Sequence, residues 1–173
     1  LVGIGPGAVP HLQSLHDLQD CITLRHAVTR RPAGANMGPF AGQLAPHADL
    51  QQALDDPLVQ AVIIATGSEV QLALHAQAAL AKDGIPVRVV SMPSTTVFDR
   101  QPVDYKKSVL PANLPRIAVE AGVTDGWWKY GCAAVVGLDT YGESAPAGEL
   151  FKHFGFTTEN VVATVKVALG LKR

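Results

Sequence analysis

The residues with the clearest chemical potential follow short apolar runs of the sequence. Thr66-Gly67-Ser68 comes directly after the apolar run Ala61–Ala65 and opens a helical pattern. The backbone N–H groups of such a turn are unpaired and carry the positive end of a helix dipole, so the turn could hold an anion. It lacks the further glycines of a dinucleotide fingerprint and the Gly-Lys-Ser/Thr of a phosphate loop. A tight turn closed by a serine cap is the alternative.

Two glutamates fall where ligands bind in open α/β sheets. Glu120 and Glu143 lie close to the C-terminal ends of predicted strands, and ligands bind in the crevice at that edge. Two converging carboxylates could perform acid–base chemistry if desolvation separated their pKa values. The alternative is that each glutamate satisfies loop backbone or pairs with Lys129 or Arg88.

Ser144 allows a serine hydrolase as a minor interpretation. His153 and Asp139 lie nearby in the sequence, and serine, histidine and aspartate form the triad of many hydrolases. However, the segment from Gly142 to Pro146 lacks the second glycine of a nucleophile elbow, and its proline opposes a helix directly after the serine. The sequence therefore identifies no catalytic residue.

One segment gathers three aromatic side chains. Trp127, Trp128 and Tyr130 stand close together in a chain in which only 6% of the residues are aromatic. Adjacent residues cannot share one helix face, so we expect one tryptophan ring in the core and the other exposed or at a subunit contact. Aromatic residues are enriched in such contacts, and we predict that this cluster takes part in an interface.

The sequence from residue 58 onward alternates predicted strands with predicted helices. Ser68 is expected to cap the first helix, with Gln71 as its capping-box partner and Gly84 at its end. Strands are predicted at Ala61–Ala65, Val87–Ser91, Arg116–Glu120 and Ala133–Asp139, further helices at Asp104–Val109, Asp125–Gly131, Gly148–Phe154 and Thr158–Leu169, and a turn at Pro93–Asp99. This order predicts a three-layer α/β/α sandwich with a mainly parallel sheet of about five strands.

Residues 1–57 form a separate Gly/Pro-rich segment. Glycine and proline interrupt it so often that no long helix can cross it. Short helices are expected at His11–Cys21 and Asp49–Leu54, and a loop at Arg30–Pro46. The glycines from Gly3 to Gly7 have no strand before them, so we expect a flexible chain end and not a phosphate loop.

Composition limits the expected partners. The formal net charge of -1 gives no reason to expect nucleic acid or an anionic membrane, and no apolar run approaches the roughly 20 residues that span a bilayer. Cys21 and Cys132 are too few for a disulfide framework and indicate a reducing, cytoplasmic setting. The histidines and cysteines also lack the spacing of a metal site, so no bound metal is expected.

Five segments occur in a fixed order between Val62 and Leu169. They are Ile64–Val70 (IATGSEV), Arg88–Ser94 (RVVSMPS), Ala118–Gly122 (AVEAG), Tyr141–Pro146 (YGESAP) and Phe154–Thr157 (FGFT). Together they resemble the C-terminal domain of transketolase, a thiamine-diphosphate enzyme of sugar metabolism, over about residues 58–170. The stretch from residue 20 to residue 57 does not resemble that family.

The resemblance implies a homodimeric enzyme that transfers a two-carbon ketol unit between sugar phosphates in the pentose phosphate pathway. In that family, thiamine diphosphate and Mg2+ lie between a diphosphate-binding and a pyrimidine-binding domain, and neither domain is found in this chain. The resemblance therefore implies a chain that binds no cofactor alone and is inactive unless a partner chain supplies both domains. The matching residues at the sheet ends, a possible anion or effector site, are Thr66, Gly67, Ser68, Ser94, Glu120, Glu143 and Ser144.

Two alternative functions stay open from the sequence. The domain could be a non-catalytic module that dimerises through its aromatic cluster and binds a small anion or effector at Thr66–Ser68. Surface that the rest of a transketolase would cover favours such self-association. The chain could also be a small-molecule hydrolase that uses Ser144, His153 or the carboxylates.

Overall fold

The computed structural model describes residues 36, 37, 39, 41 and 57–171. Contacts divide the chain into two units, Leu1–Pro57 and Leu58–Arg173, and only the second has a described fold. The helices expected at His11–Cys21 and Asp49–Leu54 lie outside the described residues, as does most of the loop expected at Arg30–Pro46.

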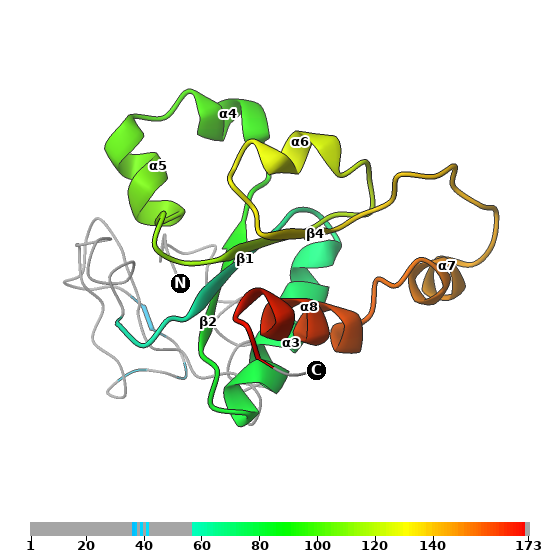
Figure 1. The fold of residues 1–173 in the computed structure, drawn as a ribbon, viewed down its shortest axis with the longest axis horizontal. Helices are drawn as coiled ribbons and strands as arrows, with labels where there is room; N and C mark the ends of the chain where they lie inside the picture. Colours follow the sequence, from blue (N-terminus) through cyan, green and yellow to red (C-terminus); the bar gives the residue numbers. More distant parts are fainter. Residues whose placement is uncertain (1–35, 38, 40, 42–56, 172–173) are drawn as a thin grey trace. The chain divides into compact units, whose positions relative to one another are not determined.

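Four parallel strands form one sheet in the second unit (Figure 1). They are β1 (Ala61–Ala65), β2 (Val87–Ser91), β3 (Arg116–Val119) and β4 (Ala134–Val136), in the spatial order β2-β1-β3-β4. Ala65 of β1 is in register with Ser91 of β2 and with Val119 of β3, so the C-terminal ends of the strands meet at one edge, the carboxyl edge. The strand order reverses between β1 and β3, and such a switch point is where open α/β sheets bind ligands.

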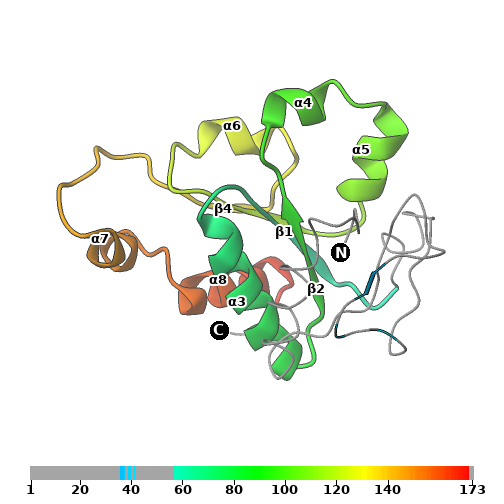
Figure 2. The same cartoon turned by 180° about the vertical axis from the view of Figure 1, so that it is seen from behind.

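Helices cover the sheet from two sides (Figures 1 and 2). They are α3 (Glu69–Lys82) and α8 (Thr158–Ala168) on one side, α4 (Thr95–Asp99), α5 (Val103–Val109) and α6 (Asp125–Trp128) on the other, and α7 (Ala147–His153), which stands apart. The predicted three-layer α/β/α sandwich is therefore confirmed. Its sheet has four strands among the described residues and not about five, because the sequence after β4 forms α7 and α8.

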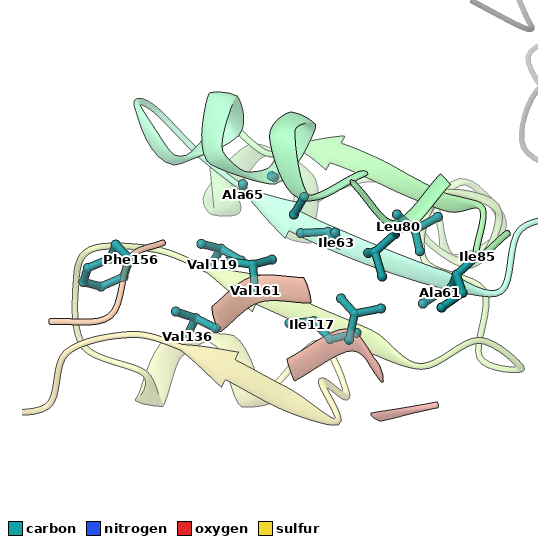
Figure 3. Packing of buried hydrophobic residues seen from close by; sticks show 14 residues of the cluster. Ala61, Ile63, Ala65, Leu80, Ile85, Ile117, Val119, Val136, Phe156 and Val161 are labelled. Carbon is teal, nitrogen blue, oxygen red and sulfur yellow. The ribbon is translucent and has the colours of Figure 1, made fainter. Parts of the chain in front are cut away.

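Apolar side chains that alternate along the strands build the core beneath α3 and α8 (Figure 3). Ile63 of β1 and Ile117 of β3 face this layer, where Leu80 of α3 and Val161 and Val165 of α8 pack against them, and all five are fully buried. The other face of β1 is buried as well, so the strand needs apolar residues at every position and shows no polar alternation.

The turn expected at Pro93–Asp99 is instead the short helix α4. Ser94 caps this helix, because its side-chain oxygen accepts a hydrogen bond from the backbone N–H of Val97 at 3.2 Å. The sequence that follows, Thr95-Thr96, has low intrinsic helix propensity, so propensity alone predicts a turn. Capping by Ser94 and burial of Phe98 stabilise the helix.

The fourth strand ends at Val136, three residues earlier than expected, because the chain turns toward the loop after β3. Leu138 donates its backbone N–H to the carbonyl oxygen of Gly122 at 2.8 Å. Gly137 lies so close to that loop that a Cβ there would stand 2.7 Å from Cγ2 of Thr124 and 3.0 Å from the Gly122 oxygen. The glycine therefore permits this close approach of the two loops.

Candidate functional site

The turn after β1 places a buried carboxylate at the carboxyl edge. Gly67 has a φ of 55°, a conformation that glycine adopts without strain, and Glu69 begins α3 with only 5% of its surface exposed. Ser68 donates its hydroxyl to Oε1 of Glu69 at 3.1 Å. The predicted capping box between Ser68 and Gln71 is wrong, because Ser68 has helical backbone angles and accepts no N–H bond with its side chain.

A second carboxylate follows β3 at the same edge. Atom Oε2 of Glu120 is buried and has no hydrogen-bond partner among the described residues. Burial raises the pKa of Glu120, and the nearby negative charge of Glu69 raises it further. The strand register explains why Glu69 acts on Glu120. Ala65 and Val119 are paired, and Glu120 directly follows Val119, whereas Glu69 lies in the turn of chain that follows Ala65.

One of the partners expected for Glu120, Lys129, is engaged elsewhere. The charge of Glu69 acts on Glu120, while Lys129 forms an ion pair with Asp99 at 2.7 Å. Glu69 in the first turn of α3 already complements the positive end of the helix dipole, and Glu120 after β3 adds a second negative charge at the same edge. The negative charges at this edge therefore disfavour the expected anion at Thr66–Ser68.

The structure separates the seven residues expected to form one site. Thr66, Gly67, Ser68 and Glu120 lie at the carboxyl edge between β1 and β3, whereas Ser94 follows β2 and serves as the cap of α4. Glu143 and Ser144 are exposed on the segment between β4 and α7, which runs outward from the sheet (Figure 1). Segment 139–149 is exposed at every residue, so these two side chains do not join Glu69 and Glu120.

The geometry does not assemble a hydrolytic triad. Asp139 accepts hydrogen bonds from the backbone N–H and the hydroxyl of Thr124 at 2.9 and 2.8 Å, and these bonds lower the pKa of its carboxyl. His153 stacks edge-on against Phe154, with ring centroids 4.8 Å apart. Burial raises the pKa of the Cys132 thiol to about 11, so this cysteine is not a thiolate nucleophile at neutral pH.

The aromatic cluster divides into buried and exposed members. Trp127 and Tyr130 are 6% and 7% exposed, and their ring centroids lie 5.9 Å apart, whereas Trp128 is 49% exposed. The expectation of one core tryptophan and one exposed tryptophan is confirmed. Of the three residues predicted to form an interface, only Trp128 offers much of its ring to a partner.

A polar cluster fixes α6 against α4. The Asp99 carboxylate accepts a hydrogen bond from the Lys129 ammonium at 2.7 Å and another from the Tyr130 hydroxyl at 2.9 Å. The bond from Lys129, followed by the bond from Tyr130, lowers the pKa of Asp99, and the same ion pair raises the pKa of Lys129. These bonds fix the chain directly after Trp128.

A groove of about 270 Å³ lies away from the carboxyl edge, between β4 and α8. Its lining residues are Ala133, Ala134, Asn160, Ala163, Thr164, Val167 and Ala168. None of these side chains titrates, and Asn160 and Thr164 already bond to backbone oxygens. The groove therefore offers no titratable side chain, unlike the carboxyl edge.

The described residues do not fit thiamine diphosphate with Mg2+. Among them, no group of three or more His, Cys, Asp or Glu side chains could hold a metal ion, and the negative charges of Glu69 and Glu120 repel a diphosphate. None of the described helices is long and apolar enough to cross a membrane.

Replacing Glu120 with glutamine is expected to stabilise the domain at neutral pH. The folded state raises the pKa of this carboxyl above 4.5, so it binds more protons than the unfolded chain. Stability is therefore expected to fall as the pH rises from about 4.5 through the raised pKa. Thermal unfolding from pH 4 to 8 should show this fall in the wild type and a weaker one in Glu120→Gln. Glu143→Gln on the exposed loop is the control, and an equal change there would contradict this account.

Sequence reasoning missed Glu69. A glutamate in the first turn of a helix is common, because it complements the helix dipole, so the residue gives no local signal of a pair. Only the adjacency of β1 and β3 brings it near Glu120. The strand order, and not the sequence motif, therefore reveals this carboxylate pair.

Comparison with known proteins identifies the domain. The family model described as the transketolase-like C-terminal domain matches residues 51–157, more than half of the chain. The match includes the last residues of the segment that was expected to be unlike the family. Transketolase 2 of Aliivibrio fischeri is 58% identical over 111 residues, which cover 62% of this chain and 17% of that protein.

Solved structures show the same relationship. Transketolase from Leishmania mexicana is 50% identical, with a TM-score of 0.63 over 67% of this chain and 17% of its own. A Pichia stipitis transketolase in complex with sedoheptulose-7-phosphate is 42% identical, with a TM-score of 0.62 over 65% of this chain and 16% of its own. The chain thus spans about a sixth of the length of these relatives, and it belongs to the transketolase family through the C-terminal domain of that family.

Proposed function

We propose that this chain supplies the C-terminal domain of a transketolase and takes part in ketol transfer only when joined to cofactor-binding domains. The observation that carries the proposal is the match of residues 51–157 to the C-terminal domain model, together with a share of only 17% of the Aliivibrio relative. The Pichia stipitis transketolase was solved in complex with sedoheptulose-7-phosphate. That complex supports a sugar phosphate as the substrate class.

The proposed role of the domain is structural. Its described residues hold no metal-binding group, and the negative charges of Glu69 and Glu120 disfavour a diphosphate, so the cofactor chemistry would belong to other domains. The assembled enzyme would use thiamine diphosphate and Mg2+ as a cytoplasmic homodimer. The chain alone would bind neither cofactor and would be inactive.

A chimera tests this proposal. In Aliivibrio fischeri transketolase 2, residues 58–171 of this chain replace the corresponding C-terminal segment. We expect the purified chimera to transfer a ketol unit from a ketose phosphate to an aldose phosphate, with kcat within about tenfold of the parent. The parent enzyme truncated before the same segment is the control. A folded chimera without turnover, beside an active parent, would contradict the proposal.

A further inference from the structure

Two arginines of the sheet point toward the side of α4, α5 and α6. Arg88 of β2 and Arg116 of β3 are both in register with Val62 of β1, and residues in register on neighbouring strands share one face of a sheet. Side chains alternate along a strand, and Ile63 belongs to the core beneath α3 and α8. The two arginines therefore lie on the opposite face, which α4, α5 and α6 cover (Figures 1 and 2).

Each arginine donates hydrogen bonds at the C-terminal end of one helix. Nη1 of Arg88 donates to the carbonyl oxygens of Ser108 and Val109, the last two residues of α5, at 3.2 and 3.3 Å. Nη1 of Arg116 donates to the carbonyl oxygen of Tyr130, directly beyond α6, at 2.6 Å. Carbonyl groups at a helix C-terminus lack partners within the helix and carry the negative end of its dipole. The arginines therefore fasten α5 and α6 to the sheet.

Contacts also join α4, α5 and α6 to one another. The ring centroid of Phe98 in α4 lies 6.3 Å from that of Tyr105 in α5 and 5.8 Å from that of Tyr130 beyond α6. The polar cluster at Asp99 joins the end of α4 to the end of α6 as well. These three helices, named here the short-helix layer, are thus connected through their own side chains.

The two sides of the sheet differ in how firmly their helices are held. Helices α3 and α8 have 14 and 11 residues and pack against each other and against the strands. The helices of the short-helix layer have 5, 7 and 4 residues, and each buries only one of them. Helices this short are not stable without contacts to other elements. Atom Nε of Arg116 is also buried without a hydrogen-bond partner among the described residues, which is unfavourable.

We propose that the short-helix layer opens from the sheet as one unit while the core beneath α3 and α8 stays folded, with Arg88 and Arg116 as its latches. Proteins open in cooperative units whose free energies lie below that of global unfolding. The contacts among the three helices make them open together, and the arginine bonds set how often they do. A ligand or partner that binds only the closed or only the opened form would shift this equilibrium. The device belongs to the domain itself and goes beyond the proposed function.

Hydrogen exchange under native conditions, followed by NMR on the whole chain at several low urea concentrations, tests the proposal. The backbone N–H groups of Phe98, Leu110 and Tyr130, the layer amides, each donate a hydrogen bond within or beside one of the three helices, and that of Val62 donates in the central strand. The layer amides are expected to share one opening free energy and one urea dependence, and to exchange at least about tenfold faster than Val62. Three unrelated exchange rates, or exchange at the rate of Val62, would overturn the proposal.

Leu80→Ala separates opening of the layer from global unfolding. Leu80 is fully buried in the core beneath α3 and α8, and this core stays folded in the opened form. The substitution is therefore expected to speed exchange at Val62 at least about tenfold and to leave the layer amides unchanged. Equal acceleration at all four positions would mean that the layer unfolds only together with the core, and would overturn the proposal.

Arg116→Met tests the latch. Its bond to Tyr130 exists only in the closed form, so exchange is expected to rise about tenfold at all three layer amides together. Arg100→Met is the control, because Arg100 donates to the carbonyl oxygen of Thr96 within α4 and is exposed, and it should leave Leu110 and Tyr130 unchanged. Acceleration at Tyr130 alone, or none, would overturn the proposal. The wild-type measurement decides it even if a substitution prevents folding.

Discussion

Replacing Trp127 with alanine is expected to lower the free energy of unfolding by about 3–5 kcal/mol, whereas the same change at Trp128 stays within about 0.5 kcal/mol. Trp127 is 6% exposed and packs against Tyr130, but Trp128 is 49% exposed. Removing the buried indole leaves a cavity beneath α6, and removing its neighbour leaves none. Urea unfolding followed by circular dichroism measures both values without relying on tryptophan fluorescence.

The two adjacent tryptophans form a matched pair, since they differ in burial and not in residue type or helix. A similar loss of stability at both positions would mean that Trp128 also packs inside the domain.

Leu80→Ala is expected to cost about 2–5 kcal/mol of stability. Leu80 of α3 is fully buried in the layer that α3 and α8 form against β1 and β3, and neighbouring helices cannot close the space without losing their own packing. The matched control is Leu171→Ala, which removes the same atoms from a side chain that is 45% exposed.

The outcome at Leu80 decides whether the second unit has one cooperative core. A loss of less than about 1 kcal/mol would indicate that the space between α3 and the sheet collapses easily, which contradicts the close packing described for Figure 3. Unfolding should be followed at two wavelengths, because coincident curves support a two-state transition.

The strands and long helices could be predicted because their local signals agree with their burial. The run Ala61–Ala65 is wholly apolar and is buried at all five positions, and the helix between Ser68 and Gly84 has the expected bounds. Short elements were predicted less well. Helix α4 depends on one hydrogen bond to Ser94, and β4 ends where Gly137 meets the loop after β3, a long-range contact without a local signal.

The candidate site was only half predictable for the same reason. Glu120 could be placed near the end of a strand from its sequence position, but its partner depends on which strands are neighbours. Glu143 was expected at the same place, yet the segment after β4 carries it outward and leaves it exposed. The order of the five sequence segments was therefore enough to indicate the family. The proximity of Glu69 to Glu120 could be recognised only once the order of the strands in the sheet was known.

The most direct test of the central claim is a ketol-transfer assay on the purified chain with thiamine diphosphate, Mg2+, a ketose phosphate donor and an aldose phosphate acceptor. Calorimetry on the same sample measures cofactor binding. The account predicts neither binding nor turnover by the chain alone, and turnover above that of the truncated Aliivibrio fischeri transketolase 2 when the two are mixed. Saturable cofactor binding with turnover by the chain alone would contradict it, because a complete cofactor site would then lie within these 173 residues.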